Sequence, residues 1–334
     1  MWQHNYTPIG GSLGLSTLAA AVPIFVLFLM LGVLRKPAWM SALSALAAAL
    51  IVALAIYGMP LPLAIISILF GAAYGLFPIA WIVFASIMLY RLTVDTGKFE
   101  IIKDSVGTLT DDRRLQALFI AFSFGAFIEG AAGFGAPVAI SGAMLAGLGF
   151  DPFFAAGMCL LANTAPVAFG SIGIPVVTLA NVTGLPIMAL SAMVGRLCAL
   201  ISVVIPAYLI VVMAGAPRAL EVLPAIIACG VSFAGMQFVA SNFIGPDLTD
   251  ILSSLTCILV MVAVLKLWRP ARIMRLEHDQ PATRTPGRYT SGEVLAAWTP
   301  YLLLVVFVLA VGAPAIKNAI DARTHAMLPA AVGK

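Results

Sequence analysis

Charged side chains are scarce in this sequence of 334 residues. Asp, Glu, Lys and Arg make up 10% of it, whereas soluble domains contain about 25%. Hydrophobic residues make up 62%, and the mean hydropathy is +1.08. This composition excludes a soluble protein and predicts an all-α polytopic membrane protein whose surroundings are the lipid bilayer. The net charge of +4 is divided among short loops. We therefore expect no nucleic-acid partner.

Side chains that commonly carry catalysis or bind metals are also rare. There are three histidines, none of them within an apolar run, and four cysteines that lie one by one within such runs. The sequence contains no HExxH or GxSxG motif and no Cys/His cluster with zinc-ligand spacing. These absences argue against an enzyme, a metal site and a cofactor. The cysteines are interpreted as small buried residues, not as a disulfide framework.

Apolar runs long enough to cross a bilayer, which takes about 20 residues, occur along the whole chain. They are 13–34, 38–57, 61–90, 186–214, 219–241, 246–267 and 292–313. The run 61–90 is expected to form one tilted, kinked span or a short helix followed by a span. Two polar loops, 91–114 and 268–291, interrupt the pattern, and the first has the composition of a short surface helix.

Basic residues set the expected orientation, because cytoplasmic loops carry an excess of Lys and Arg. Arg35 and Lys36 place the N-terminus outside, and both polar loops then lie in the cytoplasm. Residue 114 is then inside and residue 185 outside, so an odd number of crossings must connect them.

Two long apolar stretches, 115–150 and 152–182, share that connection. One full crossing and one re-entrant hairpin satisfy the parity, with three short crossings as the alternative; which stretch is re-entrant is left open. We expect about 8–10 transmembrane or re-entrant segments. Together they would form one membrane-embedded domain over residues 1–334, with broken helices in both stretches.

Glu129 is the one charge in the stretch 115–150, and Gly130, Gly133, Gly135 and Pro137 follow it closely. A charged residue at the centre of a bilayer costs about 2.5–3.5 kcal/mol on insertion scales. Irregular backbone at membrane depth must be buried in protein or line a cavity. The second stretch is broken at 163–175. Secondary transporters place their sites between discontinuous helices, so two breaks that meet at their tips would form a small anion site.

Glu129 is the candidate proton-carrying group, since burial disfavours the charged form of a carboxyl and would let it exchange protons. Its alternative role is a structural acid that caps a half-helix. Arg196, deep in the run 186–214, is the candidate for binding a substrate carboxylate or for pairing with Glu129. A snorkelling or purely structural arginine is the alternative.

The remaining candidate substrate-binding residues lie at the two breaks. Asn163 and Thr164 would contact a hydroxyl group of the substrate or form a backbone cradle, although each alone is more often a helix-to-helix hydrogen-bonding residue. The full set of candidate substrate-binding residues is Arg196, Asn163, Thr164, Ser171, Gly133 and Gly135.

Motifs along almost the whole chain resemble the lactate permease family of bacterial proton-coupled carboxylate transporters. The most distinctive are 129–140 and 163–175, and shorter ones occur at Trp2 with Asn5-Tyr6, 78–81, 194–196, 241–246 and 297–300. The resemblance implies import of L-lactate by proton symport across the bacterial plasma membrane, with D-lactate and glycolate as further substrates. It implies H⁺ as the coupling ion and no cofactor.

Family members continue with further spans and a second Gly/Ser/Thr-rich region, so the chain is expected to be the N-terminal part of a longer permease. The alternatives are a carrier of another small organic anion, a cation-coupled carrier, or a truncated membrane fragment that does not transport. A homo-oligomer is left open.

Overall fold

The computed structural model describes residues 5–107, 109–133, 135–275, 289–312 and 316. Every secondary-structure element in these ranges is a helix, which confirms the all-α prediction. The chain divides into two compact units, residues 1–81 and 82–334. The prediction of a single domain over 1–334 stays a prediction, and each unit is described by itself.

The first unit contains α1 (Leu13–Phe28), α2 (Ala38–Ala55) and α3 (Leu61–Tyr74). Helices α1 and α2 pack on each other. The Tyr57 hydroxyl, just after α2, donates a 2.8 Å hydrogen bond to the carbonyl of Ser16 in α1. After α3 the chain passes through a π-helical segment, Gly75–Ala80, into α4 (Trp81–Asp95). The predicted run 61–90 is thus two α-helices joined at the segment that contains the glycine and proline.

The second unit continues with α5 (Lys98–Gly107), the expected short helix of the first polar loop. A helical run follows from α6 (Arg113–Ala117) through the π-helical segment η3 (Leu118–Phe124) to α7 (Gly125–Ala131). All of its residues are buried. The chain then forms α8 (Ala136–Gly147), α9 (Pro152–Ala162), a 3₁₀ turn η4 (Val167–Phe169) and α10 (Gly170–Thr183). Both apolar stretches are broken, as predicted.

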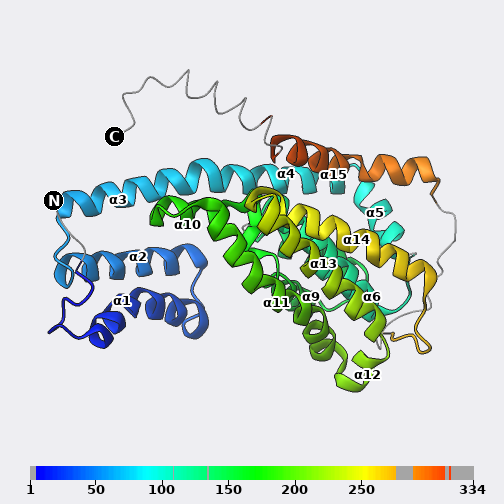
Figure 1. Cartoon of the computed structure of the whole chain (residues 1–334), viewed down its shortest axis with the longest axis horizontal. Coiled ribbons are helices and arrows are strands. Elements are labelled where there is room, and N and C mark those ends of the chain that lie inside the picture. The colour runs from blue at the N-terminus through cyan, green and yellow to red at the C-terminus, as the bar shows by residue number, and fades with distance from the viewer. Residues whose placement is uncertain (1–4, 108, 134, 276–288, 313–315, 317–334) are drawn as a thin grey trace. The chain divides into compact units, whose positions relative to one another are not determined.

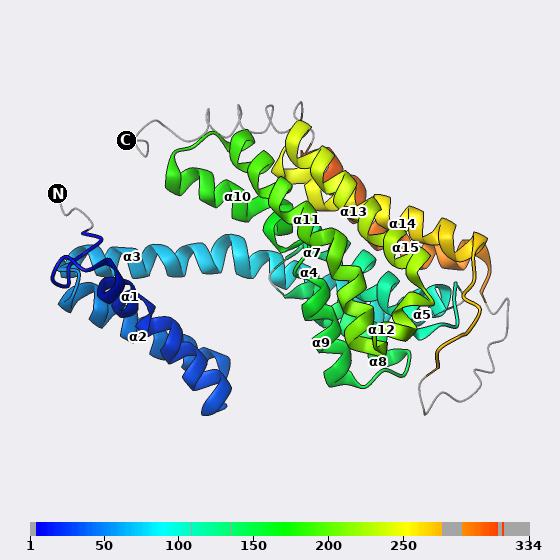
Figure 2. The same ribbon diagram turned by 60° about the horizontal axis from the view of Figure 1, so that its bottom comes forward.

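Three long helices lie beside one another in the second unit (Figures 1 and 2). They are α11 (Ile187–Ala214), α13 (Leu223–Phe243) and α14 (Thr249–Leu267); α12 (Ala216–Leu220) joins the first two and the 3₁₀ turn η5 (Pro246–Leu248) the last two. Helices α11 and α13 approach closely at Gly230. A Cβ atom on this residue would lie 2.7 Å from the carbonyl oxygen of Val203. The last described helix is α15 (Ser291–Gly312), close to the predicted run 292–313.

Helix length and composition agree with a multi-pass membrane protein. Six helices in the described part are long and apolar enough to cross a bilayer. The pair Pro152–Ala162 and Val167–Thr183 also qualifies, with a bend of 69° at its break.

The two ends of the stretch 113–150 lie together. Phe150, in the turn between α8 and α9, stacks under the guanidinium of Arg113, with the ring centroid 5.5 Å from Cζ. The chain therefore enters through α6 and returns through α8 to the same end. Helix α8 is about 18 Å long at 12 residues, too short for a hydrocarbon core of about 30 Å. The stretch 115–150 is thus a helical hairpin whose two ends lie together, and both its first arm, Arg113–Ala131, and the bent pair α9–α10 are long and apolar enough to cross a bilayer.

Candidate functional site

The two helix breaks meet each other. The first break joins α7 to α8 and contains Gly133 and Gly135, both with positive φ (60° and 87°). The second lies at the start of α10, where Ser171 and Ile172 also have left-handed backbone angles. The Ser171 hydroxyl donates a hydrogen bond to the carbonyl of Ala132, and a Cβ on Gly133 would collide with Ser171. Left-handed angles at a serine and an isoleucine are strained, and such strain is typical of functional sites.

Glu129 lies in α7, just before the first break, and packs against the second. Its side chain is 4% exposed. A Cβ on Gly170 would collide with the Glu129 carboxyl, so only glycine leaves room for it there. The amide of Asn163, the residue that directly follows α9, is a polar partner of this carboxyl. Oε2 of Glu129 and Oδ1 of Asn163 have no hydrogen-bond partner within the described residues.

A second buried acid, Asp250, lies close by and was missed by the sequence analysis. It is 1% exposed, and its Cβ lies 2.8 Å from where a Cβ on Gly130 would be. The amide side chain of Gln237, in α13, faces it. Gln237 itself accepts from the Ser202 hydroxyl (2.7 Å) and donates to the carbonyl of Ala165 (3.2 Å). Two polar side chains, Gln237 of α13 and Asp250 of α14, therefore complete the site around the two breaks.

A sequence signal for Asp250 was present. It follows a Gly-Pro step, Gly245-Pro246, much as Glu129 precedes a glycine- and proline-rich break. An acid near the start of a span is also common at an ordinary helix N-terminus, so this signal alone is weak. The structure places this terminus at the breaks, because a Cβ on Gly173 would lie 2.7 Å from the carbonyl of Pro246.

Three helix N-termini surround the breaks: those of α8, α10 and α14. Helix α8 begins directly after Gly135, α10 begins in the second break, and α14 begins at Thr249, beside Asp250. A helix N-terminus concentrates backbone N–H groups and carries the positive end of the helix dipole. The site therefore favours a negative charge, either on its own carboxyls or on a bound anion.

Arg196 does not pair with Glu129, which corrects one of the two roles suggested for it. It lies on an exposed face of α11, and its Nε donates a 3.0 Å hydrogen bond to Oδ1 of Asn242 in α13. Its Nη atoms have no partner within the described residues. Arg196 lies about 13 Å from the start of α11 at the helical rise per residue. A guanidinium at that depth is not stable against lipid alone.

The other predicted site residues separate into two groups. Asn163, Ser171 and Gly133 lie at the meeting point of the breaks, with Ser171 2% exposed. Thr164 is an exposed side chain beside Asn163, and Gly135 is exposed at the start of α8. The breaks thus bring together only part of the predicted set.

The opposite end of these helices contains a buried ion-pair network. Arg114, 0% exposed, donates to both oxygens of Asp112 (3.0 and 2.6 Å), to Glu221 (2.7 Å) and to the carbonyls of Arg218 and Arg272. Residue 114 and the start of the loop 268–291, which are both predicted to be cytoplasmic, therefore lie together at one end of this unit, beside Arg218. At about 1.5 Å per residue, Glu129 lies roughly 20 Å from this end.

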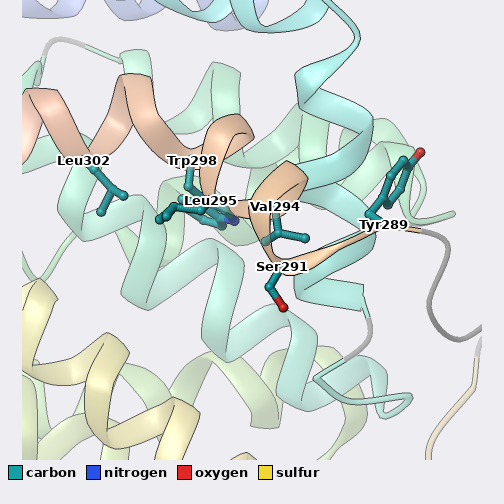
Figure 3. A pocket seen from close by; sticks show the side chains of 6 residues that line it. All are labelled: Tyr289, Ser291, Val294, Leu295, Trp298 and Leu302. Atoms are coloured by element: carbon teal, nitrogen blue, oxygen red, sulfur yellow. The ribbon is translucent and has the colours of Figure 1, made fainter.

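One cavity described by the structure lies on α15, and it has a volume of about 450 Å³ (Figure 3). Its wall is mostly apolar, and Trp298 in that wall donates a 3.1 Å hydrogen bond to the Ser105 hydroxyl in α5. It shares no lining residue with the Glu129 site. Its lining residues are Tyr289, Ser291, Val294, Leu295, Trp298 and Leu302.

These features define a multi-pass α-helical membrane protein with a buried acidic centre between interrupted helices. A model of the L-lactate permease family matches residues 16–330. The chain belongs to the L-lactate permease family.

Relatives of known name support this membership. The L-lactate permease of Bacillus subtilis (strain 168) is 51% identical over 328 residues, which cover 96% of this chain and 58% of that protein. The L-lactate permease of Salmonella typhimurium is 44% identical over 323 residues, covering 95% and 58%. The glycolate permease GlcA of Escherichia coli (strain K12) is 45% identical over 319 residues, covering 92% and 57%. The chain thus spans less than two thirds of the length of these relatives. No solved structure matches it.

Proposed function

We propose that the chain belongs to a secondary carrier that imports L-lactate, and also D-lactate and glycolate, together with protons across the bacterial plasma membrane. The relatives named for L-lactate and glycolate support this substrate class. The observation that carries the proposal is the buried Glu129 carboxyl at the meeting point of two broken helices. Discontinuous helices of this kind form the substrate and ion sites of secondary transporters.

In this proposal Glu129 carries the coupling proton. Its carboxyl is enclosed by Gly170 and Asn163, and one oxygen has no partner within the described residues, so a proton can be held there without breaking a hydrogen bond. Transport needs no cofactor and leaves the substrate chemically unchanged. The coupling ion is H⁺.

The substrate is bound by two kinds of group. Arg196 binds the carboxylate, because its two Nη atoms are free for a bidentate contact while Nε is held by Asn242. Asn163 and Thr164 contact the substrate hydroxyl, and Ser171, Gly133 and Gly135 supply the backbone cradle around it. The carboxylate contact and the proton site are therefore separate groups, as coupling between two ligands requires.

For orientation, we infer that the N-terminus is outside and that 91–114 and 268–291 are cytoplasmic. The support is the positive-inside rule together with the Arg114 network, which collects several arginines at one end. Labelling of single cysteines placed in the two loops, with a membrane-impermeant maleimide on intact cells, tests this. Labelling without permeabilisation would contradict it.

The test of function is uptake of radiolabelled L-lactate into proteoliposomes with an imposed proton gradient, acidic outside. We expect saturable accumulation that collapses with a protonophore and is inhibited by glycolate. Glu129→Gln should abolish gradient-driven accumulation, and Arg196→Lys should weaken lactate binding by about tenfold or more, because lysine lacks the planar fork.

The matched control is Asp151→Asn. Asp151 is exposed and caps α9 by accepting a hydrogen bond from the Phe154 N–H, and asparagine caps a helix equally well. Uptake by this variant should match the wild type. Flux that does not depend on the gradient would indicate a channel, and absence of flux would show that the chain alone is not a carrier. Full accumulation by Glu129→Gln would refute the proton role.

A further inference from the structure

Asp250 is a buried acid to which the proposed transport function assigns no role. Both of its carboxyl oxygens, and Oε2 of Glu129, lack a hydrogen-bond partner within the described residues. An orphaned polar atom in a protein interior is costly. One oxygen of Glu129 in α7 and both oxygens of Asp250 in α14 therefore require an explanation.

The segments that carry the two acids touch each other. Gly130, next to Glu129 in the chain, has no room for a Cβ because Asp250 and the backbone of Ile251 lie against it. The glycine allows α7 and the start of α14 to touch, which brings Glu129 and Asp250 into electrostatic contact.

The groups around the pair contain no cation within the described residues. The Asn163 amide and Asp250 face Glu129, whereas the Gln237 amide, the Cys198 thiol and Glu129 face Asp250. Two carboxyls in one buried site without a counter-cation resist being ionised together, so ionisation of one favours protonation of the other. The helix N-termini around the breaks stabilise one negative charge. A pair with one protonated and one ionised carboxyl avoids the repulsion between two charges and keeps the one negative charge that the helix N-termini stabilise.

We propose that Glu129 and Asp250 form a single two-carboxyl proton site, with Asp250 as the second acceptor of the coupling proton. The inference rests on the proposed function and deepens it. The site spans two elements, the hairpin α6–α8 through Glu129 and the α13–α14 pair through Asp250. A relative movement of these elements would change the distance between the carboxyls and hence how tightly the proton is held.

A purely structural role for Asp250 makes a different prediction. Asp250 lies in the first turn of α14, where an acidic residue interacts favourably with the helix dipole. If that were its whole role, Asp250→Asn would lower thermal stability and leave the protonation of Glu129 unchanged. In the two-carboxyl site, removing either acid changes the titration of the other.

The direct test is an infrared titration of buried carboxyl groups in the purified full chain in lipid nanodiscs. In the wild type, the protonated-carboxyl band should disappear in two steps separated by about one pH unit or more. Asp250→Asn should leave one step, and because the competing charge is gone, Glu129 should release its proton at a pH lower by about one unit or more. Glu129→Gln should shift the Asp250 step by the same amount, since coupling is reciprocal.

Each variant alone is sufficient, so failure of one to fold leaves the other decisive. Asp151→Asn, an exposed acid, should leave both steps in place. If the Glu129 step in Asp250→Asn, or the Asp250 step in Glu129→Gln, coincides with its position in the wild type, the shared site is wrong.

The titration does not depend on transport, so the two proposals can fail separately. Proton-driven lactate uptake that is lost in Glu129→Gln but keeps its full pH profile in Asp250→Asn would overturn the shared site and leave the carrier intact. Coupled titration in a chain that transports nothing would support the site and overturn the carrier function of this chain.

Discussion

Gly170→Ala gives the sharpest test of how Glu129 is held. Gly170 has φ −60° and ψ 160°, angles that any residue adopts, so alanine brings no backbone strain. The new Cβ would nevertheless lie 3.0 Å from Cδ and 3.2 Å from Cγ of Glu129, and even closer to Oε1. Glu129 is 4% exposed and cannot swing into solvent. The whole effect of the substitution should therefore act through this carboxyl.

The expected magnitude follows from two opposing terms. Overpacking a buried site by one methyl group costs about 1–3 kcal/mol. Replacing glycine with alanine lowers the entropy of the unfolded chain and returns about 0.4–1 kcal/mol. The net loss in free energy of unfolding should be about 1–2 kcal/mol. Gly157→Ala in α9 is the control, because no atom lies within 4 Å of its Cβ position, and it should be neutral or stabilising.

The assay is SDS-induced unfolding of the purified protein in mild detergent, arranged as a double-mutant cycle with Glu129→Ala. If the Glu129 carboxyl causes the clash, Gly170→Ala should cost little or nothing once that carboxyl is gone. The interaction free energy of the cycle should then be about 1–3 kcal/mol, the overpacking term alone, because the entropy term is the same in both backgrounds. Equal losses from Gly170→Ala in both backgrounds would refute the packing of Glu129 against Gly170.

Three further predictions concern the rest of the second unit. Gly230→Ala should destabilise the protein relative to Gly235→Ala on the same helix by about 1–3 kcal/mol, because only the first meets the Val203 backbone; equal unfolding midpoints would contradict this. Arg114→Ala should cost about 3–5 kcal/mol, because it leaves buried Asp112 unpaired, whereas Arg272→Ala, 86% exposed and 3.9 Å from Glu221, should cost about 1 kcal/mol or less; similar losses in thermal unfolding would argue against the buried network. Cys198, which is partly exposed, should react with a membrane-permeant maleimide before the three buried cysteines, Cys159, Cys229 and Cys257; mass spectrometry of the labelled protein would show any other order.

Short-range pattern was sufficient to predict the helices and the breaks. Apolar runs of span length became helices because a backbone in lipid must satisfy its own hydrogen bonds. Gly133, Gly135 and Ser171 marked the breaks, and glycine at positive φ is needed at the first of them. The prediction that the two breaks meet was correct, as the hydrogen bond from Ser171 to Ala132 shows.

Pairing between distant residues could not be predicted in the same way. The sequence suggested Arg196 as the partner of Glu129, because opposite charges in apolar segments are expected to pair. In the structure Arg196 is hydrogen-bonded to Asn242. The group near Glu129 is instead a second acid, Asp250. The rotation of α11 and the register of α14 decide this, and both depend on close contacts at Gly195, Gly130 and Gly230.

Hydropathy and residue spacing were sufficient to predict the class of protein, the spans, the two breaks and the buried acid beside them. These follow from hydropathy and from the conformational limits of glycine and proline, which act over a few residues. Tertiary packing was needed to show that the two ends of 113–150 meet and that a second buried acid, Asp250, lies close to Glu129. Both depend on which segments touch: Arg113 meets Phe150 at one end, and Gly130 admits Asp250 near the other. Contacts of this kind depend on the packing of whole helices, which local sequence does not specify.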